Sequence, residues 1–435
     1  MKSVIFRLLA LIIICAAALT SCGTACDCED RPVCECDPEA PSCDCKGEED
    51  TSVGGVGGDN LYIPGVGDND IPVVDLSAAT RAVLCTVAIR ATAEVEESFG
   101  FEFDVTTRDV TKAGAGIIYQ LDREAGSAYV LTNYHLLYHN DATSDDRLAH
   151  TIELYLYGQE DEQYAIPATY VGGSLVYDFA VLRVEGSEVL KKSHAIPAVL
   201  ADSEEVDILD PVLAVGDPEG LGMSVTAGMV SVNTEILEMT GADNRRIYVR
   251  VMRVDAAINE GNSGGGLYNE NGLLIGMVNA KRIGAEIDNI AYAFPSNLVR
   301  ILADNVIDHC AGGEGKTLVK YDTGATFGTK EMWLDIDPDT GRIIKRESVA
   351  VEEIAAGGAL DGLLRVGDVV KTVTVNGESR DVTLLHHLTD LAVDLRVGDK
   401  LAFTVLRTLD TGATETLTVE IEILRVMQIN PDKRK

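Results

Sequence analysis

The stretch DAAINEGNSGGGLYNENG, residues 255–272, carries the strongest evidence about the fold. Four of the six residues from 261 to 266 are glycine, and Ser263 lies among them. Runs of Gly and Asn usually form surface turns, because these residues tolerate backbone angles that others avoid. The alternative is a backbone cradle that holds a nucleophilic serine. That second interpretation requires a base and an acid elsewhere in the chain.

Two residues near strand ends fit those roles. A serine hydroxyl becomes a good nucleophile when a base takes its proton and an acid orients that base. His135 follows an apolar run in VLTNYHLLYHN, and Asp178 precedes one in YDFAVLRV. We predict that His135 is the general base, Asp178 its orienting acid and Ser263 the nucleophile. His139 and His150 are rival bases, and each predicted residue taken alone also fits an ordinary structural position.

Five segments carry a family resemblance, in the order GAGII, LTNYHL, YDFAVLRV, AVGDPEGLGMSVTAGMVS and VDAAINEGNSGGGLYNENGLLIGM. Over roughly residues 77–307 the chain resembles the HtrA (Deg) family of trypsin-like serine proteases. The resemblance implies a chymotrypsin-like double β-barrel with the active site between the barrels. It assigns the triad to His135, Asp178 and Ser263. This chemistry needs no metal ion and no organic cofactor.

The resemblance also gives roles to the residues around the nucleophile. It implies an oxyanion hole made by the backbone N–H groups of Gly261 and Ser263, which would stabilise the charge that develops in the transition state. Asn262 stands where digestive relatives carry an aspartate that pairs with a freed N-terminus, so activation by that route is not expected. Glu260 and Gly266 depart from the family, which commonly has proline at both positions. A mobile Glu260 would weaken or gate activity.

The resemblance places the main specificity pocket at Ala257, Ile258 and Asn259, just before the nucleophile loop. None of these residues carries a charge, whereas a pocket for Lys or Arg requires a buried carboxylate. We therefore expect cleavage after small or medium aliphatic residues such as Val, Ala or Ile.

The chain starts MKSVIFRLLALIIICAAALTSCG, in which Lys2 and Arg7 precede a short apolar run. The run is too short to span a bilayer comfortably, and it ends in LTSC, which resembles a bacterial lipobox. We predict a lipoprotein signal peptide over residues 1–21 and lipidation of Cys22; an ordinary cleaved signal is the alternative. The mature chain would be extracytoplasmic and held at the membrane by its acyl chains.

Residues 22–74 are predicted to be a Cys-rich and Gly/Asp-rich linker. Its first part contains three Cys-x-Cys pairs, Cys26/Cys28, Cys34/Cys36 and Cys43/Cys45. We favour a disulfide-tied stalk over a metal cluster, because the one-residue spacing and the lack of histidine do not fit a zinc knuckle. Residues 46–74 read as a flexible spacer.

Residues 75–312 are predicted to form the protease domain. Short runs rich in Val, Ile, Leu and Tyr alternate there with Gly, Pro, Asn and Asp, which is typical of a mostly β fold. Two helices are expected. One is DLSAATRAVL, capped by Asp75 or Ser77, and the other is PSNLVRILADNVIDHC, which closes the domain with Leu298, Ile301, Leu302 and Val306 on one face.

Cys85 and Cys310 are the cysteines that remain after the signal peptide, Cys22 and the three Cys-x-Cys pairs. We hypothesise a disulfide between them that ties the closing helix to the barrel, because such bonds persist outside the cytoplasm. Two buried apolar thiols are the alternative.

Residues 317–430 are predicted to be a small α+β domain. We expect strands at RIIKRESV, GDVVKTVTVNG, KLAFTVLRT and ETLTVEIEIL, and helix-like pieces around residues 351–354 and 384–391. GGALDGLLRVGDVVKTVTVNG and VGDKLAFTVLRT resemble a bacterial PDZ domain, which implies capture of a C-terminal peptide by strand addition. The candidate carboxylate loop is Thr326, Phe327 and Gly328; the alternative is a domain that only packs against the protease.

The formal net charge of −34 argues against nucleic-acid binding and against electrostatic docking on anionic lipid. The patterns together predict a membrane-anchored, extracytoplasmic serine endopeptidase. The family resemblance implies unfolded or misfolded proteins as substrates, a role in protein quality control and assembly into a homotrimer. The alternative is a catalytically dormant protease fold that acts as a binding or holdase protein through its PDZ-like domain.

Overall fold

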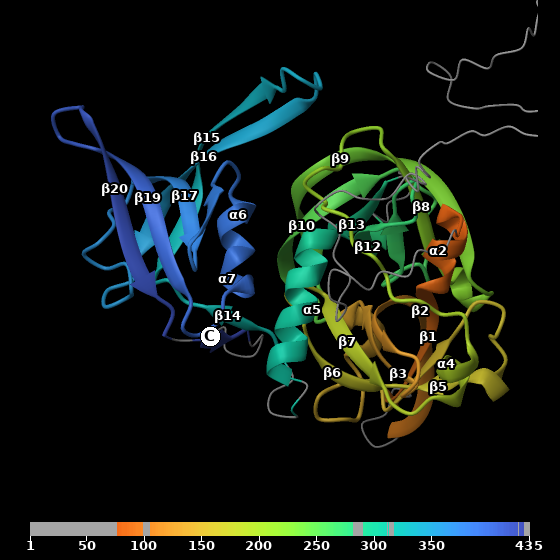
Figure 1. Cartoon of the computed structure of the whole chain (residues 1–435). Coiled ribbons are helices and arrows are strands. Elements are labelled where there is room, and N and C mark those ends of the chain that lie inside the picture. Colours follow the sequence, from red (N-terminus) through yellow and green to blue (C-terminus); the bar gives the residue numbers. More distant parts are fainter. Residues whose placement is uncertain are drawn as a thin grey trace, which may run out of the picture. The chain divides into compact units, whose positions relative to one another are not determined.

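The structure, a computed structural model, describes residues 76–98, 105–281, 290–310, 312, 317–424 and 426–429. The predicted signal peptide, Cys22, the Cys-x-Cys pairs and the spacer lie outside these residues. Within the described part of the chain, no helix is both long and apolar enough to cross a membrane. Strands dominate, so the predicted mostly β fold class is confirmed (Figure 1).

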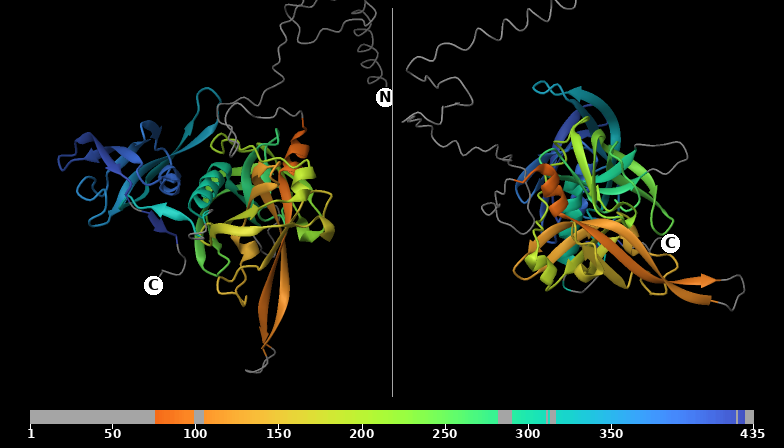
Figure 2. Two further views of the ribbon diagram at one scale, coloured as in Figure 1. Left: turned by 60° about the horizontal axis from the view of Figure 1, so that its bottom comes forward. Right: turned by 90° about the vertical axis from the view of Figure 1, so that its right-hand side faces the viewer.

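The first sheet has seven antiparallel strands in the order β5-β4-β1-β2-β3-β7-β6. The far end of the β1–β2 hairpin extends beyond the rest of this sheet (Figure 2). Alternate apolar side chains such as Ile152 and Leu154 pack into one core. The strands are β1 Thr86–Ser98, β2 Val105–Asp122, β3 Ser127–Thr132, β4 Thr151–Tyr155, β5 Ile166–Pro167, β6 Thr169–Ser174 and β7 Phe179–Val184.

Short helices accompany this sheet. They are α2 Ala78–Leu84, α3 Tyr134–Leu137, η1 Glu162–Tyr164 and α4 Glu188–Lys192. The Ser77 hydroxyl accepts a hydrogen bond from the Thr80 N–H, so Ser77 is the N-cap of α2. Asp75, the other predicted cap, lies outside the described residues.

The second sheet closes into a six-stranded barrel in the order β10-β13-β12-β11-β8-β9 (Figure 1). Its interior contains side chains such as Val254, Leu267 and Ile275. The elements are β8 Pro211–Gly216, η2 Pro218–Gly220, β9 Ser224–Thr240, β10 Arg246–Val254, β11 Gly266–Tyr268, β12 Leu274–Lys281 and β13 Ala291–Pro295.

Helix α5, Ser296–Cys310, is the predicted closing helix. Its buried face contains Leu298, Ile301, Leu302 and Val306, as the sequence pattern predicted. These side chains share one core with residues of both sheets, including Phe179 of β7 and Met277 of β12. The helix therefore joins the two halves of the protease fold.

The hypothesised disulfide between Cys85 and Cys310 is wrong, because both residues are free thiols. The Cys85 thiol donates to the Ala82 carbonyl and to the Tyr268 hydroxyl. The Cys310 thiol donates to the Thr317 carbonyl. Both are buried in the same apolar core, which fits the alternative of apolar thiols.

The C-terminal region, residues 317–429 as described, forms a sheet in the order β15-β16-β17-β19-β20, with β18 paired to β17. Strands β14 and β21 pair separately. The described residues of both regions belong to one compact unit. The elements are β14 Val319–Tyr321, β15 Ala325–Ile336, β16 Ile343–Ile354, β17 Val369–Val375, β18 Glu378–Asp381, α6 His386–Thr389, α7 Leu391–Asp394, β19 Lys400–Thr408, β20 Thr414–Glu422 and β21 Val426–Gln428.

The structure confirms most of the elements predicted for this region. The four predicted strands are confirmed as β16, β17, β19 and β20, and the helical prediction over 384–391 is confirmed as α6 and α7. The helix-like prediction at Val351–Ile354 is wrong, because these residues continue β16 and pair with Ala325–Phe327 of β15. Cross-strand pairing there overrides the helix propensity of the glutamates and alanines that follow Val351.

Candidate active site

Sheet topology brings His135 and Asp178 together. β3 and β7 are antiparallel neighbours, with Thr132 opposite Ala180, so the end of β3 and the start of β7 meet at one edge. His135 lies in α3 just after β3, and Asp178 lies just before β7. His135 Nδ1 is 2.7 Å from Asp178 Oδ2, and the His135 N–H donates to Asp178 Oδ1 at 2.8 Å. The carboxylate therefore fixes the ring and leaves Nε2 to act as the base.

The backbone at Asp178 is held in a conformation that few residues adopt. Its φ is 48°, in the left-handed region that residues other than glycine rarely adopt. Asn133 Nδ2 donates to the Asp178 carbonyl at 3.0 Å and so supports this conformation. Such local strain is typical of functional sites.

Asn279 is a site residue that the sequence analysis missed. It lies in β12 and is buried, and its Nδ2 donates to Asp178 Oδ2 at 2.8 Å. Its backbone carbonyl accepts a hydrogen bond from Ser263 Oγ at 3.2 Å. Asn279 therefore contacts both the acid and the nucleophile. A polar residue inside the apolar run LLIGMVNA was the available sequence signal.

Ser263 lies on a loop that backbone hydrogen bonds hold from both sides. The Ser263 carbonyl accepts from the Ala115 N–H of β2 at 2.9 Å, and the Gly264 N–H donates to the Val278 carbonyl of β12 at 2.8 Å. In this structure the Ser263 hydroxyl donates to the Asn279 carbonyl. Proton transfer to His135 therefore requires the hydroxyl to turn toward the free imidazole nitrogen.

The glycines of this loop are required by its geometry. Gly264 has φ 82°, and a Cβ there would lie 2.3 Å from the Ala115 carbonyl oxygen. Gly261, with φ 95°, is the third residue of a turn closed by the Asn262 N–H and the Asn259 carbonyl. A positive φ at that position is the mark of a type II turn. These glycines therefore hold Ser263 in a tightly packed backbone loop.

Gly266, the predicted departure from family proline, has a local explanation. A Cβ on Gly266 would lie 2.2 Å from the Tyr268 ring. Tyr268 is fully buried, and its hydroxyl is within hydrogen-bond distance of Thr86 and Cys85. The tyrosine thus occupies the space that a larger residue at 266 would need. Glu260 is exposed, as expected of a side chain that does not pack into the barrel.

The rival bases occupy other positions. His139 is buried, and burial, with the Lys112 charge nearby, lowers its pKa to about 4. His150 is exposed and lies beside Thr151 and Asp109. Among the described residues, His135 is the histidine paired with Asp178.

Lys112 supports the helix that carries the base. Its Nζ donates to the His135 carbonyl at 2.9 Å and to the Tyr138 carbonyl at 2.8 Å, near the two ends of α3. Burial lowers the pKa of Lys112, and the nearby Asp178 charge opposes that effect. The ammonium therefore fixes the backbone at His135 without contacting its ring.

The predicted specificity residues differ in exposure. Ile258 is buried in the core of the closed barrel, whereas Ala257 and Asn259 are exposed. The Ala257 carbonyl accepts a hydrogen bond from Thr226 Oγ1 at 2.9 Å, which links this segment to β9.

Known serine proteases are similar to this chain in sequence and in fold. A family model for the trypsin-like peptidase domain matches residues 114–277. The serine protease Do-like HtrA of Lactococcus lactis subsp. cremoris (strain MG1363) is 28% identical over 294 residues, covering 65% of this chain and 66% of that protein. The periplasmic pH-dependent serine endoprotease DegQ of Escherichia coli (strain K12) is 27% identical over 382 residues, covering 82% and 75%. A solved HtrA-type protease AlgW variant with decapeptide matches with TM-score 0.52 and 21% identity, covering 82% of this chain and 98% of that one.

The matched domain contains His135, Asp178 and Ser263. The fold and this domain define a serine endopeptidase of the trypsin-like class. Within that class, the domain and sequence matches support the HtrA (Deg) family, whereas the AlgW match shows the fold alone. The chain spans 66% of the length of the Lactococcus relative, slightly under two thirds.

Proposed function

We propose that this protein cleaves unfolded or misfolded proteins outside the cytoplasm, through the triad His135, Asp178 and Ser263. The observation that carries the proposal is the hydrogen-bonded group in which Asp178 holds the ring of His135 and Asn279 contacts both Asp178 and Ser263. A periplasmic relative such as DegQ supports the compartment. Lipid anchoring through Cys22, the quality-control role and a homotrimer belong to this proposal on the strength of the sequence alone.

The proposed chemistry is acyl transfer through these three residues. His135 Nε2 takes the proton of Ser263 Oγ as the oxygen bonds to the carbonyl carbon of the substrate. The N–H groups of Gly261 and Ser263 stabilise the oxyanion. The imidazolium then protonates the leaving amine as the C–N bond breaks, and water hydrolyses the acyl-enzyme with His135 again as base.

The substrate preference is proposed from the uncharged segment Ala257, Ile258 and Asn259. Cleavage after small or medium aliphatic residues is expected. Digestion of a proteome-derived peptide library, with Ser263→Ala as the control, would show these residues before the cut site. Dominant cleavage after Lys or Arg would contradict the assignment of the pocket.

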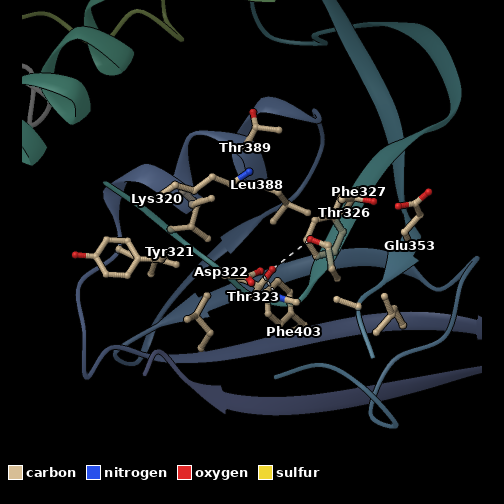
Figure 3. A pocket seen from close by; sticks show the side chains of 18 of the residues that line it. Lys320, Tyr321, Asp322, Thr323, Thr326, Phe327, Glu353, Leu388, Thr389 and Phe403 are labelled. Carbon is tan, nitrogen blue, oxygen red and sulfur yellow. Dashed lines mark hydrogen bonds between the residues drawn. The ribbon is translucent and has the colours of Figure 1, made fainter. Parts of the chain in front are cut away.

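We further propose that residues 317–430 are a PDZ-like domain, next to a protease domain at residues 75–312. β15 is the edge strand of its sheet, so one side can accept an added strand. A groove of about 380 Å³ lies between the start of β15 and helices α6 and α7 (Figure 3). Thr326 and Phe327 line it opposite Leu388 and Thr389, while Gly328 is outside its lining.

The groove has the character that an apolar C-terminal peptide requires. Phe327 stacks on Phe403 with ring centroids 5.9 Å apart, which gives the groove an aromatic floor. We expect Phe327→Asp to abolish binding of hydrophobic C-terminal peptides. The control is Met332→Asp, because Met332 lies on the same strand, is exposed and does not line the groove. Equal peptide binding by both variants would contradict a binding role for the groove.

A dormant binding or holdase protein is the second candidate. It is favoured by the Ser263 hydroxyl, which donates to the Asn279 carbonyl and not to His135 in this structure. Suppression of aggregation by Ser263→Ala at the wild-type level, without cleavage by either form, would support this candidate over the enzyme.

A further inference from the structure

Three potential metal ligands converge away from the catalytic triad. They are Glu204, in the loop before β8, and His386 and His387, the first two residues of α6. His386 Nε2 lies 3.0 Å from Glu204 Oε1, and His387 Nε2 lies 3.9 Å from Glu204 Oε2. One ligand atom from each residue falls within 4.8 Å of the others.

We propose that Glu204, His386 and His387 form a zinc site that ties the loop before β8 to helix α6. Two imidazoles and one carboxylate are a known zinc ligand set, with water in the fourth position. Imidazole nitrogen also favours zinc over magnesium or calcium, which prefer oxygen ligands. With zinc–nitrogen distances of about 2.0–2.1 Å, the three ligand atoms would lie closer to one another than the 4.8 Å limit within which they lie here.

The surroundings of His387 suit a metal-bound ring. Its Nδ1 lies 3.2 Å from the Asp381 carbonyl, an acceptor, and 3.3 Å from the Thr383 N–H, a donor. Either neutral tautomer is therefore accommodated. Zinc at Nε2 selects the form in which Nδ1–H donates to Asp381, and such a bond to the second nitrogen is usual for zinc-bound histidine.

Arg250 is a cation in direct contact with Glu204. Further basic residues line the adjoining pockets, namely Arg300, Arg342, Lys345 and Arg380. Arg250 Nη1 donates to Glu204 Oε1 at 3.2 Å, and its Nη2 donates to Asp390 Oδ2 at 2.6 Å. Asp390 thus balances the guanidinium charge. Glu204 Oε2, the oxygen on the side of His387, is the one left for zinc, while Arg250 fixes the other oxygen and orients the carboxylate.

The proposed zinc site lies next to the groove beside β15. Leu388 and Thr389 follow the two histidines on α6 and line the groove beside β15. Zinc would therefore hold one wall of that groove to the loop at Glu204. An effect on peptide binding rests on the proposed function, whereas zinc binding itself does not.

Isothermal titration of zinc chloride into the metal-free full chain tests the proposal. Accessible thiols are first alkylated, so that the Cys-rich segment cannot bind the metal. We expect one zinc per chain. We expect both His387→Ala and Glu204→Gln to bind zinc at least about tenfold more weakly than wild type.

The matched control is His194→Ala, because His194 is an exposed histidine away from this cluster, and it should bind zinc as wild type does. Circular dichroism verifies that each variant is folded. Absence of zinc binding in wild type, or equal affinity in wild type, His387→Ala and Glu204→Gln, would overturn the site. Peptidase activity is not read in this experiment, so failure of the proposed function would leave its outcome unchanged.

Discussion

Asn279 contacts two members of the proposed triad. Its side chain holds Asp178 and its backbone carbonyl holds the resting Ser263 hydroxyl. These two contacts come from different atoms, so a substitution removes only the first. The pairing of His135 with Asp178 could be predicted from sequence, because each residue lies in a local motif at the end of a strand. Asn279 could not, because its contact with Asp178 exists only after β12 and the β7 loop meet.

Asn279→Ala is expected to lower kcat by about 10- to 100-fold with little change in KM. The reason is the loss of a hydrogen bond to a charged carboxylate, worth about 1.5–3 kcal/mol. Steady-state kinetics on a peptide substrate measures the split. An unchanged kcat would show that Asp178 needs no help from Asn279.

His139 predicts a pH dependence of stability. Burial holds the pKa of this histidine at about 4, below its ordinary value of 6.5, so the folded state favours the neutral ring. The folding stability that the neutral ring contributes is fully present above pH 6.5. It is lost as the pH falls toward 4, because the unfolded chain binds the proton first. Urea unfolding should show that wild type loses more stability over this range than His139→Phe. Parallel pH profiles for the two proteins would contradict the burial argument.

Among the elements, the turn from Asn259 to Asn262 leads into the proposed oxyanion hole. Glu260 is its second residue, where type II turns favour proline, and Gly261 is its third, where they require a positive φ. Glu260→Pro should therefore keep or raise activity and stabilise the fold by about 0.4–1 kcal/mol. Gly261→Ala should lose activity. Steady-state kinetics and thermal unfolding of both variants test this prediction. An inactive Glu260→Pro variant together with an active Gly261→Ala variant would show that activity does not depend on a type II turn at this position.

Elements with strong local patterns could be predicted from sequence, and others could not. Helix α5 was recognisable from its apolar face. The segment at Val351–Ile354 was misread because its two glutamates and the alanines that follow it suit a helix, while its pairing with β15 is set by residues of another strand. The expected peptide capture by strand addition depends in the same way on β15 being an edge strand, which only the sheet order reveals.

On the scale of the whole molecule, one apolar core joins both sheets through α5 and contains both described thiols. Burial raises the pKa of Cys85 to about 12 and also raises the pKa of Cys310. Neither thiol should react with iodoacetamide in the folded chain, and both should react after denaturation without reductant. Intact mass measures the added groups. If neither thiol reacted after denaturation, the result would support a disulfide between Cys85 and Cys310.

The central claim is that Ser263, His135 and Asp178 form an assembled catalytic triad. Labelling of the full chain with a fluorophosphonate probe tests it most directly, because the probe reacts only with a serine that its base and oxyanion hole activate. We predict labelling at Ser263 in wild type and none in Ser263→Ala or His135→Ala. Absence of labelling in wild type, even with a hydrophobic C-terminal peptide present, would contradict the claim and leave the dormant binding protein as the remaining function.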